Sequence, residues 1–538
     1  MFDNKYSIKD LINSRERNKM YWKSIIINTL LFLWILGLSQ SKEVKLRKVV
    51  FFPSPQNRDV HLVFSEMAKI LLQTQKYSTT FAVHNMNVDA LNIQNSTILI
   101  YGQRSQQAYI QTLNEARSKF FVKSLLSLRA YNETNRLFMK SFSESTVLAN
   151  LTELRPNILV CDVNNFLCEY LAEKLHIARV IYYSKTMFNI YWMDHFDVHP
   201  GSYPMPNSGY TTQMNFKERV HNLINYYKLL WTGKYQKRLC KQAILTNGDG
   251  KEEELLFGVN IKPLYISEDA PSLTYPFSYP PNFVPLGCLT CSSKRPFSNF
   301  LQQFLNQYSK IILVKFEKLL DDKESQVLVG VLSKYSKIGF ILRGVIDENV
   351  ETPKNIFKDK NGNSADILSL AKTAGFINDG DYSSFLEGVY FKKPMIVLPH
   401  NYEGQSNGAL VKDRGMGIFI EDEEHFNVEH FDEAMSEILN NQSKFKRNLL
   451  INSRRILKAN NSEVIEKLFD FYFVHGAENL VVSPYLDLSS LEFYNIDIVL
   501  MVFAIFVFCC YWLGRLGKLI CGKRKKVAPK IKIDLINS

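Results

Sequence analysis

The residues best suited to chemistry are concentrated in one stretch near the C-terminal end, which reads GFINDGDYSSFLEGVYFKKPMIVLPHNYEGQSNGALVKDRGMG from Gly375 to Gly417. Carboxylates, hydroxyls and amides stand between its short apolar runs. Glu387 is the clearest candidate, because a carboxylate can accept hydrogen bonds from two hydroxyls of a ligand. The alternative for Glu387 is a solvated charge on a helix. The stretch is therefore either a working ligand pocket or the outline of one.

Two further candidates lie in the first half of the chain. His61 opens the run HLVFSEMAKILL, in a loop that follows a predicted strand, and Asp162 ends the apolar run NILVCD. A histidine at a helix start is often a capping or surface residue, and an aspartate at a strand end is often a helix cap. Position and residue type alone therefore do not decide whether His61 and Asp162 have a functional or a structural role.

Histidine and cysteine patterns predict no metal site. His195 and His199 run into a proline and a loop, which favours two surface residues. Cys288 and Cys291 form a C-x-x-C pair, but no second pair completes a zinc set. The five cysteines outside the C-terminal apolar segment do not make a secreted disulfide framework, so we expect the fold to rest on its cores; they are Cys161, Cys168, Cys240, Cys288 and Cys291.

The positive charge is confined to the two ends of the 538-residue chain. Residues 515–538 hold eight Lys or Arg against one acid, and residues 1–23 hold six against three. Of the formal charge of +12, these ends carry +7 and +3, which leaves +2 for the body. Nucleic-acid binding needs a basic folded face, so this distribution argues against it and points to a membrane.

Both basic ends flank apolar segments. Residues 25–38 have the length of a signal-peptide core that starts from Met20, and residues 1–19 are then an upstream extension. An uncleaved anchor or a buried core helix is the alternative. Residues 498–520 are long enough as a helix to cross a bilayer if Arg515 and Lys518 reach the interface.

The basic tail, residues 521–538, is predicted to be cytosolic by the positive-inside rule, which places the body on the lumenal or outer side. The expected protein is a single-pass type I membrane protein, most simply of the endoplasmic reticulum. Glycosylation sequons between the two apolar segments agree with that side; they begin at Asn95, Asn132, Asn150, Asn441 and Asn460.

Apolar strands alternate with amphipathic helices along the body. The unit recurs as KVVFF before HLVFSEMAKILL, as NILVCD before FLCEYLAEKLHI, as KIILVKF before ESQVLVGVLSKY, and as GFIND before YSSFLEGVYF. Such alternation predicts parallel sheets covered on both faces. The proline-rich run from Pro271 to Pro285 is the better domain boundary. We expect two α/β domains divided near residue 290, with a ligand site between them.

Several motifs together resemble the membrane-bound UDP-glycosyltransferases, the family that includes the UDP-glucuronosyltransferases. Three of them are SYPMPNSGYTTQMNFKERVHNLI, YPFSYPPNFVPLG and HGAENLVVSPYLDLSSLEFYNIDIV, and the fourth is the stretch from Asp366 to Asn407. The resemblance implies a GT-B fold of two Rossmann-like domains. The predicted parts are an extension and signal peptide (1–41), an acceptor domain (42–289), a UDP-sugar domain (290–490), a membrane helix (498–520) and a cytosolic tail (521–538).

The resemblance also implies roles for the candidate residues. His61 is expected to be the base that activates an acceptor hydroxyl, and Asp162 is expected to orient it. The donor contacts implied are Asp379, Gly380, Ser383, Ser384, Glu387, Glu403, Gln405 and Asn407. No metal and no cofactor are implied, since the UDP-sugar is a co-substrate. The reaction implied is inverting transfer of a sugar to a small lipophilic acceptor.

The donor half departs from the family pattern. Asp379, Gly380 and Asp381 stand where the family has a His-Gly-Gly turn, and Lys315, Phe316 and Glu317 stand where it has Ser-Phe-Gly. The family's Trp and Gln before Asp366 are absent, and Gln405 is displaced by one position. Carboxylates at the turn would repel a diphosphate by several kcal/mol, roughly, in a poorly solvated pocket.

Two functions therefore stay open. One is a glycosyltransferase, and the other is a relative that has lost donor chemistry and binds a ligand or a partner. An unrelated single-pass receptor explains only the membrane topology. Lys315, Lys392, Lys393 or His400 is a possible substitute phosphate contact. The sugar, the acceptor and the oligomeric state are not specified by these residues, and a homo-oligomer stays open.

Overall fold

The structure, a computed structural model, describes residues 46–102, 136–185, 200–247, 263–480 and 496–522. Within these ranges the short gaps are 56–57, 92, 166, 206–207, 271, 276–280, 293–295, 317–319, 321, 344–345, 347–349, 360–362, 400–401, 422–427, 457–460 and 478–479. The predicted signal segment and the cytosolic tail from residue 523 lie outside the described residues.

The first domain is built on a seven-stranded parallel sheet with the order β3-β2-β1-β4-β5-β6-β7. Its strands are β1 (Arg47–Phe52), β2 (Tyr77–His84), β3 (Thr97–Tyr101), β4 (Ile158–Asp162), β5 (Val180–Ser184), β6 (Leu264–Ser267) and β7 (Phe283–Pro285). Its helices are α2 (Arg58–Gln73), the short η1 (Asn85–Ala90), α5 (Val147–Leu154), α6 (Leu167–Lys174) and α7 (Phe216–Asn247).

The second domain is built on a six-stranded parallel sheet with the order β10-β9-β8-β11-β12-β13. Its strands are β8 (Lys310–Lys315), β9 (Ile338–Arg343), β10 (Ile356–Lys358), β11 (Thr373–Asn378), β12 (Met395–Val397) and β13 (Gly417–Phe419). Its helices are α8 (Asn299–Gln307), α9 (Asp322–Lys334), α10 (Ser364–Leu368), α11 (Tyr382–Tyr390), α12 (Tyr402–Asp413), α13 (Val428–Asn440) and α14 (Gln442–Ser453), preceded by η4 (Thr290–Ser292).

Both sheets are buried on both faces, which explains their continuous apolar runs. Val50 and Phe52 of β1 pack into one core, whereas Val49 and Phe51 pack into the core on the opposite face. The strand β8 alternates in the same way between two cores. Successive side chains of a strand point to opposite faces, so a strand buried on both sides must be apolar throughout. The predicted strand–helix alternation and the two Rossmann-like domains are confirmed.

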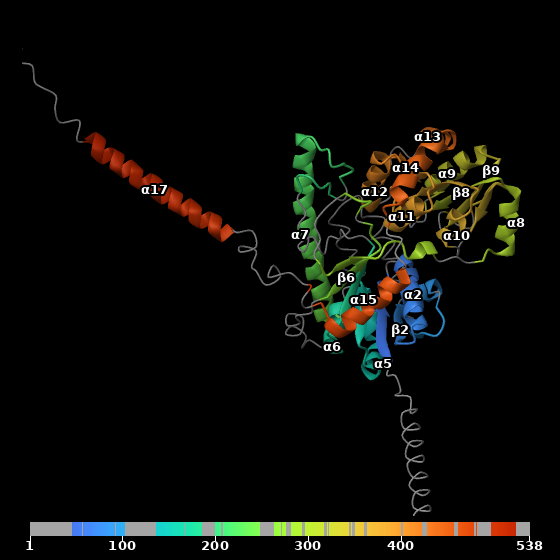
Figure 1. The fold of residues 1–538 in the computed structure, drawn as a ribbon, viewed down its shortest axis with the longest axis horizontal. Coiled ribbons are helices and arrows are strands. Elements are labelled where there is room, and N and C mark those ends of the chain that lie inside the picture. Colours follow the sequence, from blue (N-terminus) through green and yellow to red (C-terminus); the bar gives the residue numbers. More distant parts are fainter. Residues whose placement is uncertain are drawn as a thin grey trace, which may run out of the picture.

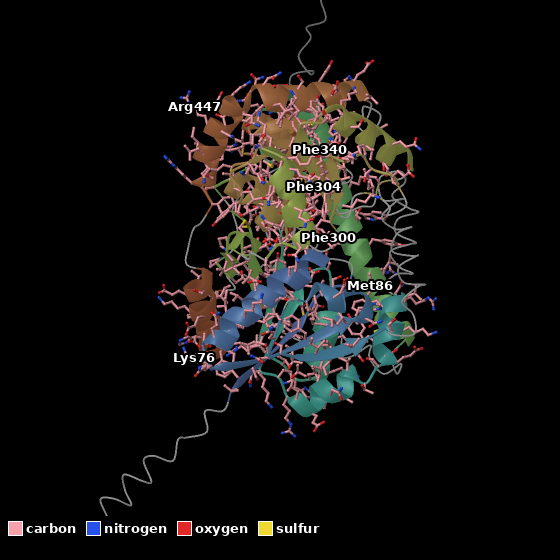
Figure 2. The ribbon with its side chains drawn as sticks, turned by 90° about the vertical axis from the view of Figure 1, so that its right-hand side faces the viewer. Lys76, Met86, Phe300, Phe304, Phe340 and Arg447 are labelled. Atoms are coloured by element: carbon pink, nitrogen blue, oxygen red, sulfur yellow. A yellow bond between two sulfur atoms is a disulfide. The ribbon has the colours of Figure 1, made fainter. Side chains whose placement is uncertain are left out.

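The helix α15 (Asn461–His475) returns the chain to the first domain. Ile465, Phe469 and Tyr472 belong to the same core as Val49 and Phe51 of β1. The ammonium of Lys76, beside α2, binds Glu466 and Asp470 at 2.8 and 2.9 Å. Figure 2 shows this helix against the first domain, near Lys76, with Phe304 and Phe340 marking the second domain above it.

The predicted domain limits meet two exceptions in the structure. The helix α15 falls within the predicted second domain, 290–490, yet it packs on the first. The predicted boundary run Pro271–Pro285 contains β7, the edge strand of the first sheet. Sequence patterns do not show such returns, because the contact partner of α15 is about 390 residues away in the chain.

Two disulfides, which the sequence analysis did not predict, are present among the described residues. Cys161 of β4 is bonded to Cys168 of α6, and Cys288 is bonded to Cys291. Their sequence separations are only 7 and 3 residues. Each bond therefore ties one local turn and does not join distant elements. The domains themselves are still held by their cores.

Two helices stand apart from the cores. The helix α17 (Ile496–Gly522) is exposed throughout its described side chains, and its residues Ile496–Lys518 are long and apolar enough to cross a membrane. The long helix α7 runs along the outer edge of the body (Figure 1). Only one side of α7 packs on the first domain, through Leu230, Tyr226 and Leu229.

Candidate active site

The candidate site lies where the two domains meet, at the carboxyl ends of their strands. From the first domain come Asp59 of α2, Lys185 after β5 and Asp269 after β6. From the second come Lys315, which ends β8, and the first turn of α11. Lys185 lies 3.8 Å from Asp381, and Lys315 lies 3.8 Å from Asp59. The Tyr382 hydroxyl donates to the carboxylate of Asp269 across the same boundary.

His61 lies in the first turn of α2, so its predicted place in a loop was wrong. The helix begins at Arg58, because the residues after β1 turn at once into the amphipathic run that packs on the sheet. The His61 side chain is fully buried, and its carbonyl accepts a hydrogen bond from the Ser65 hydroxyl at 2.7 Å. It is therefore no surface residue.

Asp162 ends β4 and is 1% exposed. Its carboxylate accepts from the backbone amide of Asn164 at 3.2 Å and from the backbone of Ser54. Burial raises the pKa of Asp162 to about 6, and these hydrogen bonds and Lys185 only partly offset the rise.

The strand ends that carry Asp162 and precede His61 are neighbours. Strands β1 and β4 pair in parallel, with Phe52 opposite Cys161. The amide of Asn165 donates to the carbonyls of Phe52 and Pro53 at 3.0 and 3.4 Å, which ties the turn after β4 to the turn after β1. The two predicted catalytic residues therefore follow adjacent strands, both buried at the edge that faces the second domain.

The turn between β11 and α11 is closed by the chain's own carboxyl and amide groups. The amide of Gly380 donates to Asn378 at 2.9 Å, and that of Asp381 to Asp379 at 3.4 Å. The amide of Tyr382 donates to Glu403 at 2.9 Å, and that of Ser384 to Asp381 at 3.2 Å. The amides at the start of a helix form a ready site for an anion. Here four amides at this turn already have acceptors.

The polypeptide is tightly packed at this turn. Gly380 has φ +76°, a conformation that favours glycine, and a Cβ there would lie 2.7 Å from Val397 and 2.8 Å from Gly404. The amide of Asn407 donates to the carbonyl of Gly380 at 2.8 Å, and Gln405 donates to the carbonyl of Glu421 at 3.0 Å. Gly380, Glu403 and Asn407 therefore build the turn itself, and Gln405 holds a neighbouring loop.

Three predicted donor contacts keep polar atoms directed into the buried interface. Ser383, Ser384 and Glu387 are 5%, 0% and 3% exposed. The Oγ atoms of both serines and Oε2 of Glu387 are buried without a hydrogen-bond partner. Buried polar atoms are nearly always hydrogen-bonded, so these three residues are the strongest candidates for a ligand contact.

A cluster of five charged side chains lies beside them, and we call it the interdomain charge cluster. Its members are Asp59, Lys185, Lys315, Asp381 and Glu387. Lys315 lies 3.9 Å from Glu387, and Lys185 lies 3.4 Å from Asp59. Three acids against two lysines leave the cluster close to neutral, so the carboxylates that the sequence placed at the turn are compensated by lysines.

Burial and charge compete within this cluster. Burial by itself lowers the pKa of Lys315, but Asp59, Glu387 and Asp381 outweigh it and hold the pKa above its usual value. Burial raises the pKa of Glu387 to about 7, and the attraction of Lys315 offsets part of the rise. Lys315 therefore stays charged at neutral pH, whereas the carboxyl group of Glu387 titrates near neutral pH.

Of the substitute phosphate contacts that the sequence suggested, Lys315 is the one at the site. The ammonium of Lys393 instead donates to the carbonyls of Leu370 and Thr373 at 2.8 and 3.0 Å. Lys392 follows α11 at its far end, with φ 57°. His400 and Glu317 lie outside the described residues.

The sequence matches the family model described as "UDP-glucoronosyl and UDP-glucosyl transferase" over residues 40–525. The chain belongs to this family. Mouse UDP-glucuronosyltransferase 2A2 is 24% identical over 451 residues, which are 76% of this chain and 79% of the mouse protein. Human UDP-glucuronosyltransferase 2B15 is 21% identical over 486 residues, 85% of this chain and 86% of the human one.

Solved glycosyltransferase structures share the fold of this family member. The glycosyltransferase SnogD from Streptomyces nogalater is similar with a TM-score of 0.52 at 13% identity, over 79% of this chain and 100% of that one. A UDP-glucosyltransferase from Polygonum tinctorium is similar with a TM-score of 0.52 at 15% identity, over 79% and 99%. At these identities the similarity establishes the GT-B fold alone.

Sequence reasoning missed the first-domain members of the site in this family member. Asp59, Lys185 and Asp269 come from three separate elements, and Tyr382 meets Asp269 from the second domain. A signal was present, because Lys185 and the pair Glu268–Asp269 directly follow apolar strands. Glu268 is itself buried and accepts from the Tyr183 hydroxyl at 2.9 Å and from the Leu289 amide at 2.8 Å.

No metal centre is evident in the described part of the chain. Among those residues no three His, Cys, Asp or Glu side chains are grouped so that they could hold a metal ion. Cys288 and Cys291 are bonded to each other and are not available as thiolate ligands.

Proposed function

We propose that the protein transfers a sugar from a UDP-sugar to a hydroxyl of a small lipophilic acceptor, with inversion at the anomeric carbon. The acceptor oxygen attacks that carbon from the face opposite UDP, a new C–O bond forms, and the bond from carbon to the diphosphate oxygen breaks. UDP leaves with the electron pair of that bond. The proton of the acceptor passes to His61, which acts as the general base.

In this proposal Asp162 stabilises the protonated form of His61. A histidine that accepts a proton gains positive charge, and an ionised carboxylate nearby favours that form. Because the pKa of Asp162 is raised to about 6, its carboxylate ionises only as the pH rises through that value. We therefore expect transfer to decline below about pH 6.

The donor is held by a set that differs from the family pattern. The Glu387 carboxylate accepts from the two ribose hydroxyls. The Ser383 and Ser384 hydroxyls, together with the ammonium of Lys315, take the diphosphate. Lysine binds phosphate as a point charge, so it can replace contacts from a helix N-terminus whose amides are already bonded.

The observation that carries the proposal is the chain of charges that spans the two strand edges. Asp59 lies two residues from His61 and 3.8 Å from Lys315, which in turn lies 3.9 Å from Glu387. Asp59 of the first domain and Glu387, the predicted ribose contact of the second, thus both approach the partly buried Lys315. A sugar donor bound at Lys315 would have its reactive carbon near the first-domain edge.

The test is UDP binding by calorimetry, on the full chain in detergent. The expected result is micromolar to millimolar binding that Glu387→Ala and Lys315→Ala each weaken at least tenfold. Lys393→Ala is the matched control, because that lysine binds backbone carbonyls away from the site. Absence of binding up to millimolar UDP, with an unchanged melting curve, would reject the enzyme function.

A second candidate function is supported by the turn before α11. Four of its amides donate to side chains of this protein, and the Asp381 carboxylate stands at the helix N-terminus. A relative that binds a lipophilic ligand without a donor fits that observation. It predicts that a fluorescent lipophilic acceptor binds equally well with and without UDP, and that no UDP is released from any UDP-sugar.

We propose a single-pass type I topology, with the body in the lumen of the endoplasmic reticulum after removal of a signal peptide. Two disulfides favour an oxidising compartment. The sequon asparagines within the described residues, Asn95, Asn150 and Asn441, are exposed. Endoglycosidase H should lower the apparent mass of the protein from cells. An unchanged mass would contradict lumenal glycosylation.

A further inference from the structure

Among the described residues of the body, the exposed large apolar side chains are concentrated on one helix. Seven lie on α7, which are Phe216, Val220, Leu223, Ile224, Tyr227, Trp231 and Tyr235. We call these seven residues the α7 stripe. Outside α7 and the membrane helix α17, nine exposed large apolar residues are scattered over Leu46, Ile98, Ile100, Phe300, Val428, Leu450, Ile451, Phe471 and Val474.

The stripe is a continuous surface that points away from the protein. A helix turns about 100° per residue, so its seven members fall on one arc of roughly 120°. Asn222 and the partly buried Leu229, which face the first domain, lie on the other side of the helix, and Leu230 packs on the first domain beside the edge of the stripe. Trp231 and Tyr235 stack with ring centroids 5.3 Å apart. Helix α7 thus carries apolar residues on the side that packs on the first domain and also on the exposed stripe.

The charged residues of α7 are almost all basic. Phe216–Asn247 contains seven Lys or Arg and one acid, Glu218, which gives a net charge of +6. The body without the basic chain ends carries only +2, so the rest of it is net acidic. Lys217, Lys228 and Lys234 are among the exposed members. Aromatic and aliphatic residues flanked by exposed lysine and arginine are typical of a helix that lies in a membrane interface.

We propose that the α7 stripe lies on the surface of the bilayer in which α17 is anchored. The tether is short, because only 20 residues separate the end of α15 at His475 from the start of α17 at Ile496. The apolar side chains enter the boundary between headgroups and acyl chains, and the basic side chains meet lipid phosphates. This inference does not depend on the transfer activity.

The test separates the stripe from the α17 anchor. A protease site is inserted among residues 481–495, and the full chain is reconstituted into vesicles of phosphatidylcholine with or without phosphatidylglycerol. After cleavage, flotation shows whether the freed body stays with the vesicles. We expect it to stay when phosphatidylglycerol is present. The combined variant Phe216→Ser, Ile224→Ser, Tyr227→Ser and Trp231→Ser should lower the bound fraction at least tenfold.

The matched control changes four exposed apolar residues elsewhere, Phe300→Ser, Val428→Ser, Leu450→Ser and Ile451→Ser, and should leave binding unchanged. All eight positions are exposed, so equal melting temperatures check that every variant is folded. Release of the wild-type body from both kinds of vesicle would overturn the proposal. A freed body that is dimeric in solution, and that the stripe variant makes monomeric, would overturn it in favour of a second copy as the partner.

Discussion

The candidate site has two edges, one from each domain, and the residues at their strand ends differ in how they are buried and hydrogen-bonded. At the first-domain edge, His61 and Asp162 are buried after adjacent strands. At the second-domain edge, the turn before α11 is filled by hydrogen bonds from its own amides to Asn378, Asp379, Asp381 and Glu403. The first-domain edge thus holds two buried titratable side chains after neighbouring strands, whereas the second-domain edge is lined by charged side chains that satisfy its own turn.

The difference shows how acidic residues can stand at the start of a buried helix in the folded protein. A buried carboxylate is costly unless it is paired and hydrogen-bonded. Asp381 meets both needs, because it caps α11 and lies 3.8 Å from Lys185 of the first domain. The replacement at the turn is therefore coupled to residues of the other domain. It is not a local loss.

The largest expected effect is on the first-domain half of the candidate site, which carries His61 and Asp162. His61→Ala should lower kcat of sugar transfer by about 10²–10⁴-fold, because the acceptor proton loses its base. UDP affinity should not change by more than about twofold, since the base does not contact the nucleotide in our proposal. Transfer assays with UDP-sugars and UDP calorimetry on the same preparation measure the two quantities. Equal loss of both would show that His61 is structural.

The next effect is on the second-domain half of the candidate site, where Lys315 and Glu387 lie. Lys315→Met should lower the free energy of unfolding by about 3 kcal/mol, because the buried Glu387 and the partly buried Asp59 lose their shared cation. Chemical denaturation of the full chain in detergent measures the change. The double variant Lys315→Met with Glu387→Met should recover part of the loss. No recovery would mean that packing of the lysine, and not its charge, is what matters.

The titration of Glu387 should appear as a pH dependence of stability. Its pKa is raised from about 4.5 in the unfolded chain to about 7, so the folded protein binds the proton more tightly between these values. The stability contributed by this group is therefore present below about pH 4.5 and lost as the pH rises through 7. Glu387→Gln lacks this loss.

Relative to wild type, Glu387→Gln should gain about 3 kcal/mol of stability between pH 4.5 and pH 8. Denaturation curves at both values measure the difference between the two proteins. Glu433→Gln is an exposed acid control and should show no such trend. A stability difference that does not change with pH would contradict the buried placement of Glu387.

The smallest expected effect tests whether the carboxylate at the turn before α11 weakens UDP binding. Asp381→Gly restores the residue of the family pattern at the turn and removes one negative charge from the helix N-terminus. UDP affinity should rise about tenfold, which corresponds to roughly 1.4 kcal/mol. Glycine is a tolerated N-cap, so stability should fall by only a few tenths of a kcal/mol. Unchanged affinity in calorimetry would show that the turn is not where the diphosphate binds.

Local patterns in the chain were sufficient for the fold class and for the strand ends. Continuous apolar runs such as KVVFF and KIILVK can only be strands buried on both faces, and the amphipathic runs after them can only be covering helices. Residues directly after such strands had to meet at one edge of a sheet. The family resemblance, matched to those strand ends, is what named His61, Asp162 and Glu387 as candidates from the sequence.

Tertiary structure alone decided which charges meet. Lys185 and Asp381 are 196 positions apart in the chain, and Lys315 and Asp59 are 256 apart, and neither spacing follows any helical or strand period. The return of α15 to the first domain and the two-sided character of α7 were equally invisible. Periodicity reports only that a face is apolar, and which surface covers that face depends on the packing of whole domains, because burial is non-directional.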